Sequence, residues 1–83
     1  MNGETEGGVR SIRRLREERG WTQLELAYRL GVTPVTIYNW ERGRTEPRVS
    51  QFRQLARLFG VSMDDIALDG EDPEGTAALA ENT

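Results

Sequence analysis

Apolar residues recur every three or four positions through the middle of the chain, a spacing typical of short amphipathic helices. Val9, Ile12 and Leu15, for example, form one stripe on an arginine-rich segment that ends near Arg19. Later segments repeat this spacing, so each predicted helix turns one apolar face inward. The residues expected to face the core are Val9, Ile12, Leu15, Leu24, Ala27, Leu30, Ile37, Trp40, Phe52, Leu55, Ala56 and Phe59.

Glycines and capping residues divide this pattern into separate helices. A glycine follows each apolar segment, and glycine readily takes the left-handed conformation that ends a helix. Thr22-Gln-Leu-Glu25 and Ser62-Met-Asp-Asp65 have the form of capping boxes, and Thr33-Pro34 is typical of a helix start. No segment carries a strand signal. The sequence therefore predicts a compact, all-α fold of five helices, at about residues 9–19, 22–30, 33–42, 49–59 and 62–66.

Polar flanks bound this helical segment. Residues 1–8 are rich in glycine and glutamate and lack apolar periodicity, so we expect a flexible N-terminal tail. Residues 69–83 are acidic and rich in small residues, and we expect them to be disordered. The helical domain is predicted to span residues 9–68.

The formal charge of −3 conceals an uneven distribution along the 83 residues. All eleven basic residues are arginines, and they lie between residues 9 and 60 with five acids, which gives that segment a charge of +6. The other nine acids lie outside that segment, two in residues 1–8 and seven in residues 61–83. A basic body suits a polyanionic partner, and a solvated surface is the alternative interpretation.

The residue types that are absent exclude several classes of function. The chain has no cysteine, histidine or lysine, which argues against an enzyme, a metal site and a disulfide framework, and we expect no cofactor. The apolar runs are far shorter than the ~20 residues of a membrane span, so we expect no membrane partner and a cytoplasmic location.

The second and third predicted helices are separated by a very short connection. Gly31 and Val32, with Thr33 as the next cap, leave room only for the tight turn of a helix-turn-helix, in which the helices cross at about 90–120°. The outer face of the third helix, with Val35, Thr36 and Asn39, carries no acid. With basic residues at its exit, that face suits a groove lined with phosphates.

At these positions the sequence resembles the phage-repressor-like helix-turn-helix family, also called the XRE family, of bacterial and phage DNA-binding regulators. The resemblance runs from Ile12 to about Leu68 and implies a lambda-repressor-like domain that binds double-stranded DNA and associates with the nucleoid when bound. It rests on the segments Ile12 to Gly20, Trp21 to Ala27, Leu30 to Thr33, Ile37 to Gly43 and Leu55 to Ser62, together with Pro47.

The resemblance implies roles for individual residues. Thr33 to Arg42 matches the recognition helix, and Arg16 with Glu41 matches a structural ion pair between the first helix and the end of that helix. Tyr38 is left open between packing on the surface and a hydrogen bond to phosphate. The base-contacting positions are Pro34, Val35, Thr36 and Asn39, and the predicted contacts to the DNA backbone are Thr22, Gln23, Tyr38, Arg42 and Arg44.

The residue types agree with these roles. Asn39 can pair in bidentate fashion with adenine, and Val35 or the methyl group of Thr36 can pack on a thymine methyl. Val35 departs from the family pattern, in which glutamine is common, and this predicts modest discrimination of an A/T-containing target. Arginines at helix ends supply salt-dependent affinity for the backbone.

A module with so few base contacts is expected to act as a dimer on two half-sites about 34 Å apart, as a transcriptional repressor. Val61, Met63, Ile66 and Leu68 are candidates for that interface and equally for the core. The alternative function is an antitoxin-like or anti-regulator module that binds a protein through its fifth helix and acidic tail. A further hypothesis is that the tail competes with DNA for the arginine face.

Overall fold

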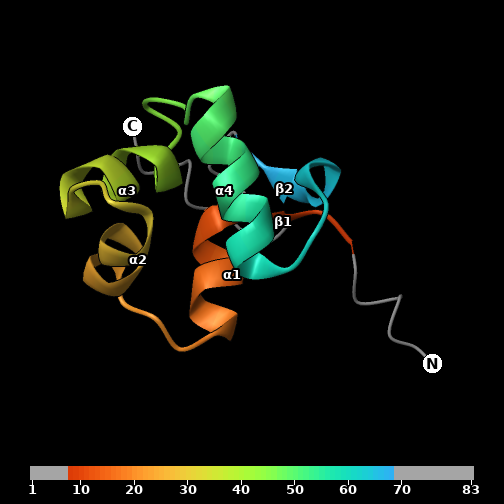
Figure 1. The fold of residues 1–83 in the computed structure, drawn as a ribbon, viewed down its shortest axis with the longest axis horizontal. Helices are drawn as coiled ribbons and strands as arrows, with labels where there is room; N and C mark the ends of the chain where they lie inside the picture. The colour runs from red at the N-terminus through yellow and green to blue at the C-terminus, as the bar shows by residue number, and fades with distance from the viewer. Residues whose placement is uncertain (1–7, 69–83) are drawn as a thin grey trace, which may run out of the picture.

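Residues 8–68 are described by the computed structural model, and they form a helical bundle closed by a small sheet (Figure 1). The predicted flexible tail, apart from Gly8, and the predicted acidic tail lie outside the described residues. In chain order the elements are β1 (Arg10–Ser11), α1 (Ile12–Glu18), α2 (Gln23–Leu30), α3 (Pro34–Glu41), α4 (Val49–Phe59), the 3₁₀ turn η2 (Met63–Asp65) and β2 (Ile66–Ala67).

The helices and the sheet are arranged from one end of the fold to the other. In Figure 1, α2 and α3 lie together at one end, α1 and α4 occupy the middle, and the sheet lies at the opposite end. Within residues 8–68, no helix is long and apolar enough to cross a membrane.

All four α-helices end in the same glycine turn, as the sequence predicts. At each end the N–H of a glycine donates to the carbonyl three residues back, and the next N–H donates to the carbonyl five residues back. The glycines are Gly20, Gly31, Gly43 and Gly60, with φ between 72° and 75°.

Hydroxyl side chains begin the first three α-helices. Thr22 and Glu25 form the predicted capping box, because the Thr22 hydroxyl accepts from the Glu25 N–H and the Glu25 carboxylate accepts from the Thr22 N–H. Thr33 caps α3 ahead of Pro34, also as predicted. Ser11 caps α1 by accepting from the Arg14 N–H, so this helix begins at Ile12 and not near Val9.

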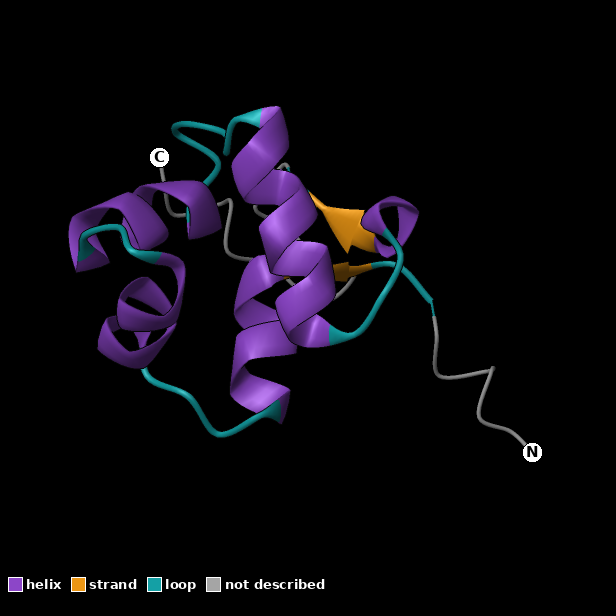
Figure 2. Cartoon of the chain, in the orientation of Figure 1, coloured by secondary structure: helices purple, strands orange, loops and turns teal. Residues whose placement is uncertain are grey.

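The prediction of five helices without a strand is wrong. Met63–Asp65 form a single 3₁₀ turn, and the chain then extends as β2, which pairs in parallel with β1 through Arg10 with Ile66 and Ser11 with Ala67 (Figure 2). The Ser62 hydroxyl accepts from the Asp64 N–H, two residues on, in place of the Asp65 N–H that a capping box requires. Two-residue strands are too short to show alternation, and they pair only because the helices bring the two ends together.

The core lies where α1, α2, α3 and α4 meet. Its buried residues are Ile12, Leu15, Leu26, Ala27, Ile37, Trp40, Leu55, Ala56, Phe59 and Ile66. Two inward predictions are wrong, since Val9 is 54% exposed and Leu24 is 64% exposed. Val9 precedes the helix, and α2 buries Leu26 in place of Leu24.

Candidate nucleic-acid interface

The turn between α2 and α3 fixes the angle at which α3 leaves α2. Gly31 has a φ of 75°, which L side chains rarely adopt, and the Val32 N–H donates to the Ala27 carbonyl at 3.0 Å. Thr33 then caps α3 by accepting from the Thr36 N–H at 3.1 Å. Ala27 and Ile37 are both buried, so the two helices face each other and the opposite face of α3 turns outward.

The outward face of α3 carries the four predicted base-contacting residues. Pro34 and Val35 are exposed, and Thr36 and Asn39 are half-buried. The Thr36 and Thr33 hydroxyl oxygens lie 2.9 Å apart in a hydrogen bond, so the Thr36 hydroxyl has a partner within the helix. Glu41 is the one acid in α3, and it is buried.

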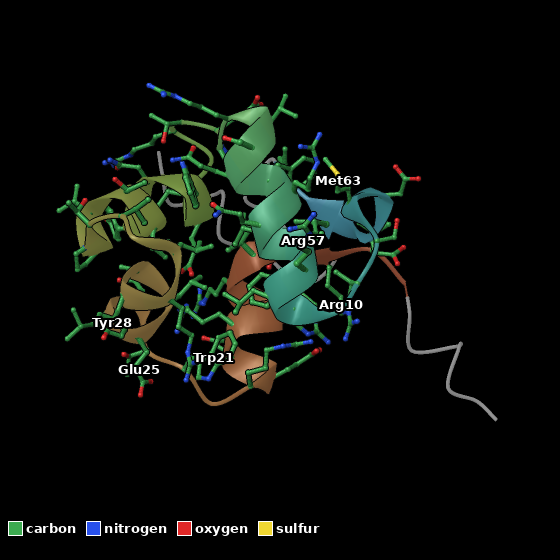
Figure 3. All side chains as sticks on the ribbon, viewed as in Figure 1. Arg10, Trp21, Glu25, Tyr28, Arg57 and Met63 are labelled. Atoms are coloured by element: carbon green, nitrogen blue, oxygen red, sulfur yellow. The ribbon has the colours of Figure 1, made fainter. Side chains whose placement is uncertain are left out.

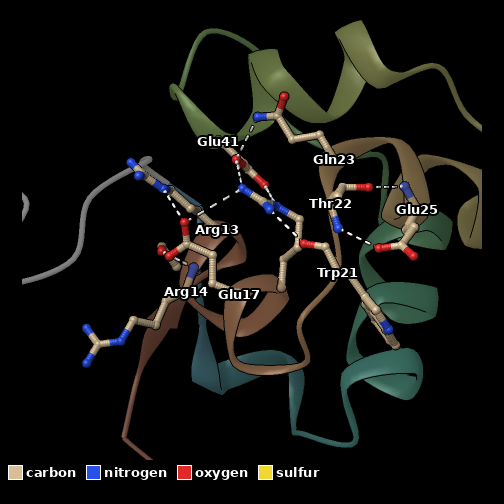
Figure 4. A network of polar contacts seen from close by, with 10 residues as sticks. Arg13, Arg14, Glu17, Trp21, Thr22, Gln23, Glu25 and Glu41 are labelled. Atoms are coloured by element: carbon tan, nitrogen blue, oxygen red, sulfur yellow. Dashed lines mark hydrogen bonds and ion pairs between the residues drawn. The ribbon is translucent and has the colours of Figure 1, made fainter.

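Glu41 belongs to a polar network that joins three helices (Figure 4). Arg16 Nε donates to Glu41 Oε2 at 2.6 Å and Arg16 Nη2 donates to Glu41 Oε1 at 3.1 Å, which makes a bidentate ion pair. Gln23 Nε2 donates to Glu41 Oε1 at 3.0 Å, and Arg16 Nη1 donates to the Trp21 carbonyl at 2.8 Å. The start of α2 and the end of α3 are thereby held to α1.

The two predicted backbone contacts at the start of α2 are partly engaged within the protein. The Thr22 N–H donates to the Glu25 carboxylate at 2.8 Å and is therefore occupied. The phosphate contact implied for Thr22 would be made by its hydroxyl, which accepts from the Glu25 N–H and retains a proton to donate. Gln23 uses one amide N–H on Glu41 and has a second. Both residues lie at the N-terminus of a helix, where anions are favoured.

The exit of α3 gathers the remaining predicted contacts. Gly43, with a φ of 75°, turns the chain so that the Arg44 N–H donates to the Asn39 carbonyl at 2.9 Å. The guanidinium carbons of Arg42 and Arg44 lie 5.5 Å and 5.8 Å from the centre of the Tyr38 ring. Asn39, Tyr38 and the two arginines are therefore neighbours at one end of α3.

Ion pairs divide the arginines into two groups. Those of β1, α1 and the loop after α1 lie within 4.0 Å of a glutamate, namely Arg10, Arg13, Arg14, Arg16 and Arg19. No ion pair with an acid in residues 8–68 is formed by the other six, which are Arg29, Arg42, Arg44, Arg48, Arg53 and Arg57. The positive charge at the exit of α3 is therefore uncompensated within the described fold.

Sequence reasoning missed the aromatic contacts. Arg29 lies 4.4 Å from the centre of the Trp21 ring, and Trp21 stacks on Phe59 with 6.1 Å between ring centres. The spacing of four between Tyr38 and Arg42 was a visible signal for one such contact. The contact of Arg44 with the same ring depends on the turn at Gly43 and had no signal in the sequence.

Exposed apolar residues on α2 were also missed. Leu24 is 64% exposed and Tyr28 is 84% exposed, and both line a shallow hollow with Glu25 and Arg29. Figure 3 shows Glu25 and Tyr28 on the side of α2 that faces away from α3. The residues proposed for a dimer interface lie elsewhere: Ile66 is buried, and Val61, Met63 and Leu68 are partly buried against the core.

Comparison with known proteins gives consistent relatives. A family model described as Helix-turn-helix matches residues 12–66. An uncharacterized HTH-type transcriptional regulator of Methanothermobacter thermautotrophicus is 44% identical over 62 residues, which cover 74% of this chain and 90% of the relative. The cryptic phage CTXphi transcriptional repressor RstR of Vibrio cholerae is 35% identical, over 72% of this chain and 54% of the relative. Antitoxin HipB of Escherichia coli is 29% identical, over 80% of this chain and 75% of the relative.

No solved structure matches the chain. The family model nevertheless covers both helices of the turn and every residue from α1 into β2. The matched range contains the glycine turn at Gly31, the outward face of α3 and the network around Glu41. The chain therefore belongs to the XRE-type helix-turn-helix family.

Proposed function

We propose that this protein is a transcriptional repressor that binds double-stranded DNA at a specific sequence, with the segment Thr33–Arg42 in the major groove. The observation that carries the proposal is the exposed face of α3, which has no exposed acid and ends at two arginines without an ion pair in residues 8–68. A face of this kind fits a groove whose edges are phosphates.

The proposed roles follow from side-chain chemistry. Asn39 reads adenine through its amide, and Val35 contacts a thymine methyl. The Thr36 hydroxyl is engaged by Thr33, so we assign its methyl group to the same kind of contact. Pro34 lies at the first position of α3, beside these residues. The proposed contacts to the DNA backbone are Thr22, Gln23, Arg42 and Arg44, and the Tyr38 ring lies beside the two arginines.

A second copy of the chain is the proposed partner on DNA. One recognition helix reads only a few base pairs, and two copies on half-sites about 34 Å apart would double the number of base contacts. The similarity to RstR, which is named a transcriptional repressor, supports repression as the outcome of binding.

The test begins with selection of bound duplexes from a random library, using the full chain. The affinity of the enriched duplex is then compared with that of a scrambled duplex. We expect Asn39→Ala to weaken binding to the enriched duplex by about 1–3 kcal/mol and to change scrambled DNA little, and Arg44→Ala to weaken both alike. No enrichment, or equal losses for the two variants on both duplexes, would contradict the proposal.

A protein-binding function is the second candidate, and the similarity to the antitoxin HipB favours it. Salt dependence separates the two candidates, because DNA binding that depends on phosphate contacts strengthens steeply as salt is lowered. If duplex DNA shows no electrophoretic mobility shift with the protein at about 50 mM salt, a protein partner is favoured.

A further inference from the structure

The ring of Tyr38 contacts two arginines at once. The guanidinium carbons of Arg42 and Arg44 lie 5.5 Å and 5.8 Å from the ring centre, within the ~6 Å at which a cation is attracted to an aromatic ring. Tyr38 is 39% exposed, so the ring borders solvent and the two cations lie at the surface. The sequence left two roles open for Tyr38, surface packing and a hydrogen bond from its hydroxyl to phosphate.

The backbone brings both arginines to the ring. Arg42 follows Tyr38 by four residues and lies on the same face of the helix, and its N–H donates to the Tyr38 carbonyl at 3.1 Å. Arg44 would lie on another face if α3 continued. Gly43 reverses the chain with a φ of 75°, and the Gly43 and Arg44 N–H groups donate to the Trp40 and Asn39 carbonyls at 3.1 Å and 2.9 Å.

We propose that Tyr38 is a positioning residue whose ring holds Arg42 and Arg44 in place for the DNA backbone, and that its hydroxyl makes no essential contact. This inference rests on the proposed function. Within residues 8–68 neither arginine has an ion pair that would orient it, and the ring provides that restraint. A guanidinium held against a ring keeps N–H donors at its edge for phosphate oxygens.

Restraint of the arginines lowers the cost of binding. A long flexible side chain loses conformational freedom when it is fixed on DNA, and a side chain already held near its bound position loses less. The gain is independent of base sequence, because phosphates are the same at every site. Loss of the ring should therefore weaken binding to every duplex by one common factor.

The experiment compares Tyr38→Phe, which keeps the ring, with Tyr38→Leu, which removes it, in the full chain. Binding to the enriched duplex and to a scrambled duplex is measured at about 50 mM salt. We expect Tyr38→Phe to stay within about twofold of the unchanged protein, and Tyr38→Leu to bind both duplexes roughly tenfold more weakly. Urea unfolding checks that each variant is folded, and Tyr38→Met replaces Tyr38→Leu if the leucine variant is unfolded.

The matched control is the same pair of changes in an Arg42→Ala/Arg44→Ala background. A ring that acts through the arginines has nothing to hold there, so Tyr38→Leu should have no further effect. Three results would overturn the inference: equal losses for Tyr38→Phe and Tyr38→Leu, a loss confined to the enriched duplex, or a full loss that persists without the arginines. If the unchanged protein binds neither duplex, the proposed function fails instead.

Discussion

The buried ion pair between Arg16 and Glu41 predicts an unusual pattern of stability in a double-mutant cycle. The Arg16 and Glu41 side chains are 10% and 4% exposed, and two hydrogen bonds join them. Replacing one partner with an apolar residue leaves the other charge buried, which typically costs about 3–5 kcal/mol. Replacing both with apolar residues removes the buried charges together, so the double variant should be more stable than either single variant.

The neighbours of the ion pair determine how much stability each single variant loses. After Glu41→Leu, Arg16 keeps its hydrogen bond to the Trp21 carbonyl, and Glu17 lies 4.0 Å from Arg16 Nη2 as a replacement partner. After Arg16→Met, Glu41 keeps only the amide of Gln23. We therefore expect a loss near 3 kcal/mol for Glu41→Leu and a larger one, nearer 5 kcal/mol, for Arg16→Met.

The double variant should lose less than about 2 kcal/mol. It leaves the Trp21 carbonyl without its Arg16 donor, a penalty of about 1–3 kcal/mol when such a group is fully buried. Gln23 is only half-buried and can turn its amide to water.

Urea unfolding followed by tryptophan fluorescence measures these differences, since Trp40 is buried and reports on the core. A domain of about 60 residues has roughly 3–9 kcal/mol of stability in total, so the single variants are measured in sucrose to keep them folded. Arg13→Met is the control, because the Arg13 and Glu17 side chains are 64% and 51% exposed and the loss should stay under about 1 kcal/mol. Single losses below about 1 kcal/mol, or a double loss equal to the sum of the single losses, would refute the reasoning.

Three further predictions concern the helix ends and the acidic segment. Gly43→Ala should lower stability by about 1–2 kcal/mol in urea unfolding, because the φ of 75° at this position disfavours a side chain. The same change should weaken binding to all duplexes, because it displaces Arg44. Unchanged stability would contradict the turn geometry. Thr22→Ala should lower stability by about 1 kcal/mol in the same assay through loss of the cap, whereas Thr45→Ala, in the loop before α4, is the matched control and should change little. Deletion of residues 69–83 should raise DNA affinity at low salt if this acidic segment competes for the arginines, and equal affinity would reject the competition.

Local chemistry made the helix ends predictable. Gly20, Gly31, Gly43 and Gly60 each stand where a helix needs a left-handed residue, and the conformation depends on the glycine itself. Thr22 with Glu25 is predictable for a similar reason, since both hydrogen bonds of the capping box lie within four residues.

Features that depend on the packing of distant segments were not predictable. Ile66 lies 56 residues beyond Arg10 in the chain, and their pairing exists only because α1 and α4 bring the two ends together. The sequence did not decide which face of α2 turns toward the core. An eight-residue helix with apolar residues at positions 24, 26, 27 and 30 has two faces that are about equally apolar. Packing against the rest of the core selects the face that contains Leu26.

The candidate site also has features that the sequence could predict and features that it could not. The sequence motif predicted which residues would lie together on the third helix, because their spacing in the sequence decides that. It could not predict that Arg44 returns to the Tyr38 ring, since that contact depends on the exact course of the chain after Gly43.

Ion pairing within the fold explains how an acidic chain can offer a basic site. The formal charge of −3 counts every side chain equally, yet an arginine that is paired with a glutamate contributes little to the attraction of phosphate. Glu17, Glu18 and Glu41 are placed against the arginines of β1, α1 and the following loop. Arg42 and Arg44 are two of the six arginines without an ion pair in residues 8–68, and they lie at the end of α3, where the proposed function places the DNA backbone. The position of the unpaired arginines, more than the total charge, is therefore the property of this fold that favours DNA.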